Sequence, residues 1–253
     1  MVASFFNRFG YAIVAHVAFI LLWQLATMVT DLPSYILPSP LETIVELWEP
    51  SYNWPTHIWA TTAEIVGGYS LAVLVGVTLS VLFVWVPALN SGAMPLLVTL
   101  NMIPKVAMAP LFIVWLGIGL VPNMVIAFTI CFFPIMLTTY RGLIEVEPDL
   151  INLVRSLRAN RWQIFIKIQL PGSLPYLFSG MKVAAVLAVA GAIVGEFIAS
   201  QRGLGYFLLA QQNALNTSAM MMSLIFITLI GVSLYGFVLL LEYIFISRKG
   251  IAT

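Results

Sequence analysis

The sequence predicts an all-α, polytopic membrane protein that crosses the bilayer six times. Of its 253 residues, 61% are hydrophobic and only 8% are charged. The mean hydropathy of +1.03 is too high for a soluble domain. Several apolar runs reach the roughly 20 residues that a helix needs to cross a bilayer. The few basic residues also gather in segments that a six-span arrangement places on one side of the membrane.

The apolar runs define one transmembrane domain that covers the whole chain, residues 1–253. The first run, Tyr11–Val29, is not followed by a clear small-x-small cleavage site, so we expect a retained span and not a signal peptide. Cys131 is the single cysteine, so an internal disulfide is excluded, and we expect it to be an inert core residue. The six predicted spans cover about residues 11–29, 62–85, 94–116, 121–139, 177–198 and 221–246.

Basic residues set the expected orientation of the chain. Six spans place eight of the 11 Lys and Arg residues on one side: Arg8, the five basic residues from Arg141 to Lys167, and the pair Arg248 and Lys249. We therefore expect both termini and the loop at about 141–175 to be cytoplasmic. A five-span arrangement would separate Arg248 and Lys249 from that loop. The net charge of +1 gives no reason to expect nucleic acid as a partner.

Two external segments are expected to form short helices. The proline-rich stretch Leu32–Pro40 predicts a stiff connector, because proline fixes φ. It leads into a helix at Leu41–Trp48, with Ser39 as the cap and Pro40 in the first turn. A second short helix is expected at Tyr206–Ala214.

The basic loop at about 141–175 predicts two short helices. Pro148 opens the first, and Asp149 places negative charge in its first turn. The second covers Trp162–Ile168. An apolar stripe with helical spacing runs along the first helix and consists of Leu150, Leu153, Val154 and Leu157. The loop thus combines an apolar docking face with a basic rim. The alternative is that its charges only anchor the loop on the cytoplasmic side.

The loop resembles the coupling loop of binding-protein-dependent ABC import permeases. That family's pattern is Glu-Ala-Ala, three residues, Gly, nine residues, Ile, one residue, Leu-Pro. Ile168, Leu170 and Pro171 match its end at the correct spacing. Asn152–Val154 stand where Glu-Ala-Ala would be, and Arg158 replaces the glycine. Arginine at that position predicts either a gentler turn or a strained one.

Other segments resemble the nitrate/sulfonate/taurine branch of this family. They are Ile103–Leu111 followed by Trp115–Gly119, and Gly195–Phe197 with Gly203–Tyr206. The likeness covers most of residues 35–210 and implies a type I importer architecture of six transmembrane helices. By resemblance, the residues that contact the ATPase are Asp149, Asn152, Leu153, Arg155, Arg158, Ala159, Arg161, Trp162, Ile168, Leu170 and Pro171.

The resemblance also implies the partners. A second copy of the chain would complete the pathway across the lipid bilayer of the inner membrane. Cytoplasmic ATPase subunits would hold the loops, and a periplasmic or external solute-binding protein would deliver a small polar solute. That solute would be a small oxyanion or an organic sulfonate such as taurine, with a small heterocyclic vitamin precursor as another possibility.

The chain itself is not expected to be an enzyme. It lacks the G-x-x-x-x-G-K-[ST] phosphate loop, so ATP and Mg²⁺ would bind the partner ATPase. We expect no catalytic residue, metal site or cofactor in this chain.

Several residues inside the spans are candidates for the pathway. Lys105 would cost about 2.5–3.5 kcal/mol at the centre of a span, so it should face protein or a water-filled cavity. It would either line the pathway with Pro104 and Met108, or serve packing alone. Glu196 would be either a gate at the outer mouth or a cap on nearby backbone. Glu64 is expected at the membrane–water interface, near the outer start of the second span. Lys182 and Glu242 are expected to reach the lipid headgroups.

Two other functions remain open. An ion-gradient-driven secondary transporter would need a membrane acid, for which Glu196 is the candidate. A non-transporting membrane scaffold would need neither Lys105 nor proline breaks within its spans.

Overall fold

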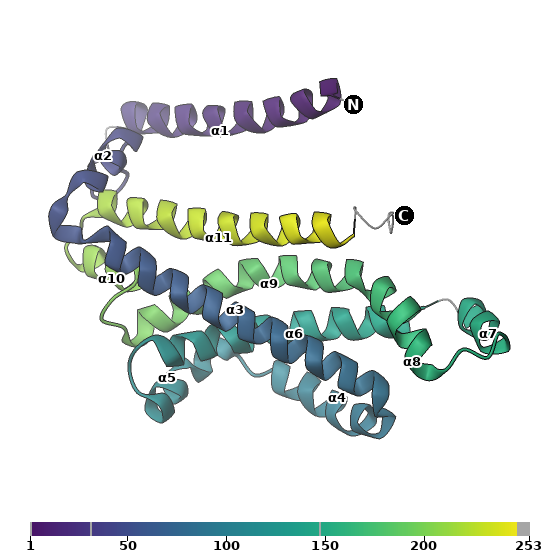
Figure 1. The fold of residues 1–253 in the computed structure, drawn as a ribbon. Helices are drawn as coiled ribbons and strands as arrows, with labels where there is room; N and C mark the ends of the chain where they lie inside the picture. The colour runs from purple at the N-terminus through teal and green to yellow at the C-terminus, as the bar shows by residue number, and fades with distance from the viewer. Residues whose placement is uncertain (1, 31, 147, 247–253) are drawn as a thin grey trace.

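The computed structural model describes residues 2–30, 32–146 and 148–246, and every regular element within them is helical. The long helices run side by side, with short helices at both ends (Figure 1). This arrangement confirms the all-α prediction. The elements are α1 (Val2–Thr30), α2 (Pro40–Val45), η1 (Glu46–Trp48), η2 (Pro50–Tyr52), α3 (Trp54–Trp85), α4 (Pro87–Asn101), α5 (Lys105–Leu116), α6 (Leu120–Ile144), α7 (Pro148–Ser156), α8 (Arg161–Ile164), the π-helical turn η3 (Phe165–Gln169), α9 (Leu170–Ala199), α10 (Leu204–Asn213) and α11 (Thr217–Phe245).

In the described part of the chain, five helical segments are long and apolar enough to cross a membrane, and there are six if a bent pair of helices counts as one span. The five are Ile13–Thr30, Pro50–Trp85, Leu120–Ile144, Arg161–Ile198 and Thr217–Phe245.

The segment at 94–116 differs from the continuous helix that was expected there. It consists of α4 and α5, which meet at an angle of 97°. Pro104 precedes α5, and its missing N–H and fixed φ prevent a regular helix from continuing through this point.

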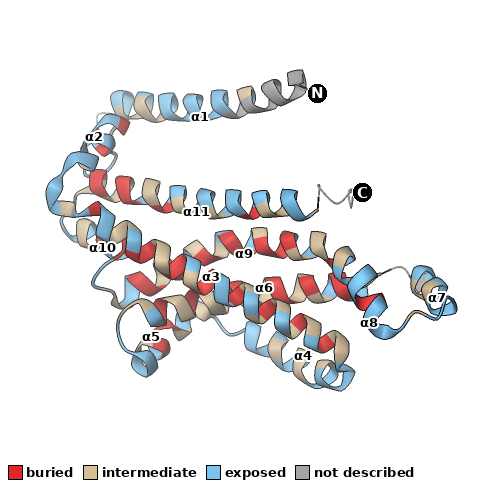
Figure 2. Cartoon of the chain, in the orientation of Figure 1, coloured by how far each residue is buried: buried red, intermediate tan, exposed pale blue. Residues whose placement is uncertain are grey.

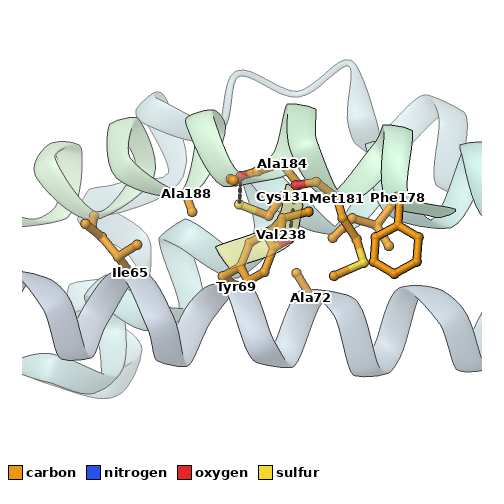
Figure 3. Packing of buried hydrophobic residues seen from close by; sticks show 12 residues of the cluster. Ile65, Tyr69, Ala72, Cys131, Phe178, Met181, Ala184, Ala188 and Val238 are labelled. Atoms are coloured by element: carbon orange, nitrogen blue, oxygen red, sulfur yellow. Dashed lines mark hydrogen bonds between the residues drawn. The ribbon is translucent and has the colours of Figure 1, made fainter. Parts of the chain in front are cut away.

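The core forms where α3, α6 and α9 pack together. Figure 3 shows Tyr69 of α3 and Cys131 of α6 against the alanines of α9, with Val238 of α11 closing the group. The Tyr69 hydroxyl donates to the Met181 carbonyl at 3.0 Å, and the Cys131 thiol donates to the Ala184 carbonyl at 3.3 Å. These bonds satisfy polar groups that water does not reach.

Small residues let α9 approach α6 closely. A Cβ atom added at Gly191 would lie 2.8 Å from Ala127 Cα, and one added at Gly195 would lie 2.5 Å from Asn123 Oδ1. The G-x-x-x-G pair of α9 therefore serves a helix contact within one copy of the chain.

The outer surfaces of α1 and α11 are largely exposed and apolar (Figure 2). Apolar helix faces of this kind are what lipid requires. α1 stands apart from the bundle, and its Trp23 Nε1 donates to the Pro38 carbonyl at 2.9 Å.

Both predicted external helices are present. α2 carries the full capping box, in which Glu42 N donates to Ser39 Oγ at 3.2 Å and Ser39 N donates to Glu42 Oε2 at 2.7 Å. α10 spans Leu204–Asn213, close to the predicted range.

The two charged residues predicted among the lipid headgroups contact each other. Lys182 Nζ of α9 lies 2.9 Å from Glu242 Oε2 of α11 in an ion pair, and their place at headgroup level stays a prediction. The pair joins two spans and leaves each side chain about a quarter exposed, at 26% and 24%.

Candidate functional site

α7 projects from one end of the bundle and is exposed on most of its surface (Figures 1 and 2). Leu150, Leu153 and Leu157 are 40%, 57% and 73% exposed. Exposed leucines on a helix outside the membrane mark a surface that a partner covers. Val154, the fourth residue of the predicted stripe, is half-buried.

Arg158 ends α7 in the strained form of the turn. Its φ is +61°, in the left-handed region that favours glycine. Arg158 N donates to the Arg155 carbonyl at 2.9 Å, and Ala159 N donates to the Val154 carbonyl at 3.0 Å. This pair of bonds is a Schellman motif, in which the left-handed position is usually glycine. The turn is therefore as sharp as the family glycine would make it.

α8 begins with its own capping box. Gln163 N donates to Asn160 Oδ1 at 2.8 Å, and Asn160 N donates to Gln163 Oε1 at 2.9 Å. From there the chain runs through η3 into α9 as one continuous helical segment, Arg161–Ile198. The second half of the loop is thus one end of a helical segment long enough to cross a membrane.

The π-helical turn η3 lies directly before Pro171. Proline lacks an N–H, and its ring clashes with the carbonyl four residues earlier in a regular helix. The wider turn gives this ring room, and Leu170 N donates to the Phe165 carbonyl five residues back. Pro171 of the Leu-Pro motif therefore sets the rotation of α8 relative to α9.

Arg161 connects α8 to the end of α3. Its Nη2 donates to the Val84 and Trp85 carbonyls at 3.1 and 3.2 Å. These carbonyls lie in the last turn of α3, where helix carbonyls have no partner within the helix and the dipole attracts a cation. The guanidinium also lies 5.0 Å from the centroid of the Trp85 ring.

An aromatic cluster of Trp85, Trp162 and Phe165 supports the same connection. The Trp85 ring centroid lies 5.6 Å from that of Trp162 and 5.5 Å from that of Phe165. Gln169 Nε2 adds a bond of 3.1 Å to the Leu143 carbonyl near the end of α6. The ends of α3 and α6 are therefore both attached to the segment that begins at α8.

The predicted loop residues separate into two groups. One is exposed and free for contact with a partner: Asp149, Asn152, Leu153, Arg155 and Arg158. The other leads into or supports the span: Ala159, Arg161, Trp162, Ile168, Leu170 and Pro171. A cavity of about 560 Å³ lies between the groups, with Arg155 and Arg161 both in its lining.

Sequence reasoning did not assign five residues to this site: Trp85, Asn160, Gln163, Phe165 and Gln169. The Asn160-x-x-Gln163 spacing is a capping pattern and could have been recognised. Trp85 could not, because it lies 76 residues before Arg161, and only the fold brings them together.

Lys105 is engaged at the bend between α4 and α5. Its Nζ donates to the carbonyls of Leu100, Asn101 and Ile103 at 3.1, 2.6 and 3.1 Å. These three bonds use the three protons of the ammonium group. The geometry supports the packing alternative for Lys105, and its place in the pathway stays a prediction.

A cavity of about 360 Å³ adjoins this bend. Lys105, Met108 and three phenylalanines of α6, Phe128, Phe132 and Phe133, are in its lining. Pro104 lies exposed beside it.

Glu196 lies at the opposite end of the molecule from α7 and is only 1% exposed. Its carboxylate accepts a bond of 2.5 Å from Thr61 Oγ1 and another from Gly205 N. Within one copy of the chain it caps backbone, as the second alternative predicted. Glu64 lies nearby and is also 1% exposed, so the expectation that it sits at the interface is wrong.

Residues 61–249 match the family described as binding-protein-dependent transport system inner membrane component. The chain belongs to this family. It is therefore a permease of the ABC transporter class, in which a separate ATPase hydrolyses ATP and a solute-binding protein is a partner.

Curated relatives agree with this assignment. The chain is 34% identical over 187 residues to the formylaminopyrimidine transport permease protein ThiX of Halalkalibacterium halodurans, with 74% of each chain covered. It is 31% identical over 223 residues to the riboflavin transport system permease protein RibX of Chloroflexus aurantiacus, with 87% of this chain and 83% of that one covered. It is 24% identical to the putative aliphatic sulfonates transport permease protein SsuC of Bacillus subtilis, over 93% of this chain and 87% of that one.

The fold is similar to that of a solved transporter. The inward-facing MetNI methionine ABC transporter matches with a TM-score of 0.54 and 21% identity, over 72% of this chain and 93% of that one. The match confirms the predicted permease fold.

Proposed function

We propose that this permease forms the translocation pathway of an ATP-driven importer as a homodimer, and that α7 and α8 are its contact with the ATPase. The observation that carries the proposal is the pairing of an exposed leucine stripe on α7 with a fixed attachment of α8 to α3. A partner that binds the stripe can displace the loop, and the attachment passes that displacement to the spans. ATP and Mg²⁺ remain on the ATPase.

The attachment makes the loop a lever. Arg161, Trp162 and Gln169 hold the loop to the ends of α3 and α6, while η3 continues it into α9. These three helices also form the core of the bundle. ATPase closure would therefore shift the equilibrium between inward-open and outward-open arrangements, because the partner contacts the loop differently in each.

We place the loop in the cytoplasm and the permease in the inner membrane. The N-terminal end of α1 and the C-terminal end of α11 lie at the same end of the bundle as α7 and α8 (Figure 1). This supports cytoplasmic termini, together with the basic residues Arg155, Arg158 and Arg161. Arg248 and Lys249 lie outside the described residues, as does the side chain of Arg8.

For the solute, the observations favour a small heterocycle over a small oxyanion. The cavity at the bend is lined by phenylalanine rings. The Lys105 ammonium group already donates to backbone carbonyls, so it is not free to bind an anion. Two relatives above 30% identity carry names for formylaminopyrimidine and riboflavin transport. The sulfonate relative keeps an organic sulfonate as one alternative, and the bicarbonate transport system permease protein CmpB of Synechocystis, 30% identical over 203 residues, keeps a small oxyanion as another. An external binding protein would select the solute and deliver it.

The test is co-purification in mild detergent from the native host. We expect a stoichiometric ATPase subunit with the natural chain, and its loss when Leu153 and Leu157 are both replaced by serine. The control is Leu47→Ser, an exposed leucine near α2 at the other end of the molecule. Recovery of the ATPase with both variants would contradict the proposed contact. Absence of an ATPase from the natural chain would favour an ion-driven transporter or a scaffold.

A further inference from the structure

Four polar side chains lie buried together at the end of the bundle opposite α7. Thr61 and Glu64 come from α3, Asn123 from α6 and Glu196 from α9, and each is no more than 1% exposed. In the described part of the chain, Glu64 and Glu196 are the two charged side chains in the buried class. Buried carboxyl groups require partners that compensate for the lost water.

Glu196 has the partners of an ionised carboxylate. Thr61 Oγ1 donates to Glu196 Oε1 at 2.5 Å, and Gly205 N in the first turn of α10 donates to Glu196 Oε2. Thr61 Oγ1 in turn accepts from Leu204 N at 2.7 Å. Glu196 therefore receives donors on both oxygens at a helix N-terminus, where negative charge is favoured.

Glu64 has the partners of a neutral acid. Asn123 Nδ2 donates to Glu64 Oε1 at 2.9 Å. Glu64 Oε2 and Asn123 Oδ1 are buried and have no hydrogen-bond partner among the described residues. Glu64 lies three positions after Thr61 on α3, and Thr61 bonds Glu196, so the two carboxyl groups are neighbours in this buried cluster. A proton on Glu64 would supply the missing bond between the two acids.

The other charged groups described around the pair do not neutralise the second carboxylate in place of that proton. Arg202, in the turn before α10, attracts the Glu64 carboxyl only from an exposed position. His57 of α3 is half-buried, and its Nδ1 lies 3.0 Å from Gly203 N. Tyr206 of α10 stacks on His57, with ring centroids 6.2 Å apart. Two adjacent buried carboxylates without a buried cation repel each other strongly, so one of them retains a proton.

Backbone geometry shows that the chain is built closely around the pair. Gly203 has a φ of +118°, and a Cβ atom added there would overlap the Glu196 carboxyl. A Cβ atom added at Gly205 would lie 2.8 Å from Glu196 Oε2. The turn between α9 and α10 can approach Glu196 only because both positions are glycine.

We propose that Glu64 and Glu196 form a proton-binding carboxyl pair, with the proton on Glu64 and the charge on Glu196. The pair holds the turn before α10 against α3 and α6. Binding of the proton removes one of two like charges and forms the bond from Glu64 to Glu196. Its release leaves two buried charges, and the turn detaches. Resting on the proposed function, this turn lies at the external end, where a binding protein would deliver solute.

The direction of the pH effect follows from this assignment. The attachment is present while Glu64 holds its proton, and it is lost as the pH rises far enough to remove that proton. Glu64→Gln keeps the shape and neutrality of the protonated acid, so the variant keeps the attachment at alkaline pH. The His57 titration is present in both proteins and cancels in their comparison.

The first test is infrared spectroscopy of the full-length permease in lipid nanodiscs at neutral pH. We expect a protonated-carboxyl C=O band that shifts in D₂O, is lost in Glu64→Gln and persists in Glu49→Gln, which replaces an exposed acid. Absence of the band from the natural chain, or its persistence in Glu64→Gln, would overturn the proposal. Neither result depends on ATPase binding or uptake, so the proposed function is tested separately.

A second measurement needs no variant to fold. In the natural chain, the band should disappear as the pH is raised, and hydrogen exchange at Leu204 and Gly205, corrected for the intrinsic rise of base-catalysed exchange, should accelerate over the same pH interval. Disappearance of the band without faster exchange at these two amides would overturn the attachment.

Discussion

Arg155 and Arg161 carry the same charge but have different tasks. Arg155 lies exposed on α7, beside the leucine stripe. Arg161 is directed back at the membrane domain, where it binds two carbonyls of α3 and the face of Trp85. Sequence reasoning assigned both to the ATPase contact. The structure instead predicts that their substitutions have distinguishable effects.

We expect Arg161→Gln to uncouple ATP hydrolysis from transport. The ATPase subunit should still be recovered, because the leucine stripe is intact, while uptake falls by about tenfold, within the range of typical coupling energies of 1–3 kcal/mol. Uptake by cells and subunit recovery measure the two effects.

The matched comparison is Arg155→Glu, which should weaken subunit recovery. Arg161→Lys should restore only part of the uptake, because an ammonium group lacks the planar fork of the guanidinium. Equal loss of subunit recovery in Arg155→Glu and Arg161→Gln would contradict this division.

Arg158 stores strain at the end of α7. A left-handed conformation costs a non-glycine residue roughly 1–2 kcal/mol. Arg158→Gly should therefore stabilise the turn by about 1 kcal/mol and slow hydrogen exchange at Arg158 and Ala159. The control is Arg155→Gly inside α7, which should destabilise the helix by about 1 kcal/mol. Faster exchange in both variants would show that Arg158 is not strained.

At the scale of elements, the bend between α4 and α5 depends on Lys105. Lys105→Met leaves three exposed carbonyls at the bend without their donor, and lipid offers such carbonyls no other partner. We expect lower thermal stability, and equal reductions in the uptake of anionic and neutral solutes. Lys105→Arg, which keeps donors at this position, is the control. Selective loss of anionic solute at unchanged stability would instead place Lys105 in the pathway.

Local patterns predicted the elements that depend on local chemistry. Ser39 and Pro40 predicted the start of α2, and the leucine spacing predicted α7, because caps and stripes involve residues three or four apart. Glu64 was misplaced for the opposite reason. Its burial depends on Asn123 and Glu196, which lie 59 and 132 positions away along the chain, so local sequence around Glu64 carries no sign of it. The same holds for the pairing of Lys182 with Glu242.

At the scale of the whole molecule, one helical segment connects the two functional ends. It begins with Arg161 at the attachment to α3 and reaches Glu196 near its other end. A displacement of α8 therefore reaches the turn before α10 without crossing a loop. About 35 helical residues, each rising 1.5 Å along the axis, make this segment roughly 50 Å long.

Within this segment, η3 fixes how α8 is rotated about the helix axis. A π-helical turn contains one residue more than a regular helix would, and one residue corresponds to about 100° of rotation. Deleting the exposed Ile166 should restore a regular helix and turn α8 by that amount, moving Arg161 away from the Val84 and Trp85 carbonyls. We expect the ATPase subunit to remain bound while uptake is lost.

The control for this deletion is Ile166→Ala, which removes the same side chain but keeps the extra residue. It should transport nearly as well as the natural chain, because the rotation of α8 is unchanged. Full uptake in the deletion variant would mean that the loop acts on the spans through α9 alone, without its attachment to α3.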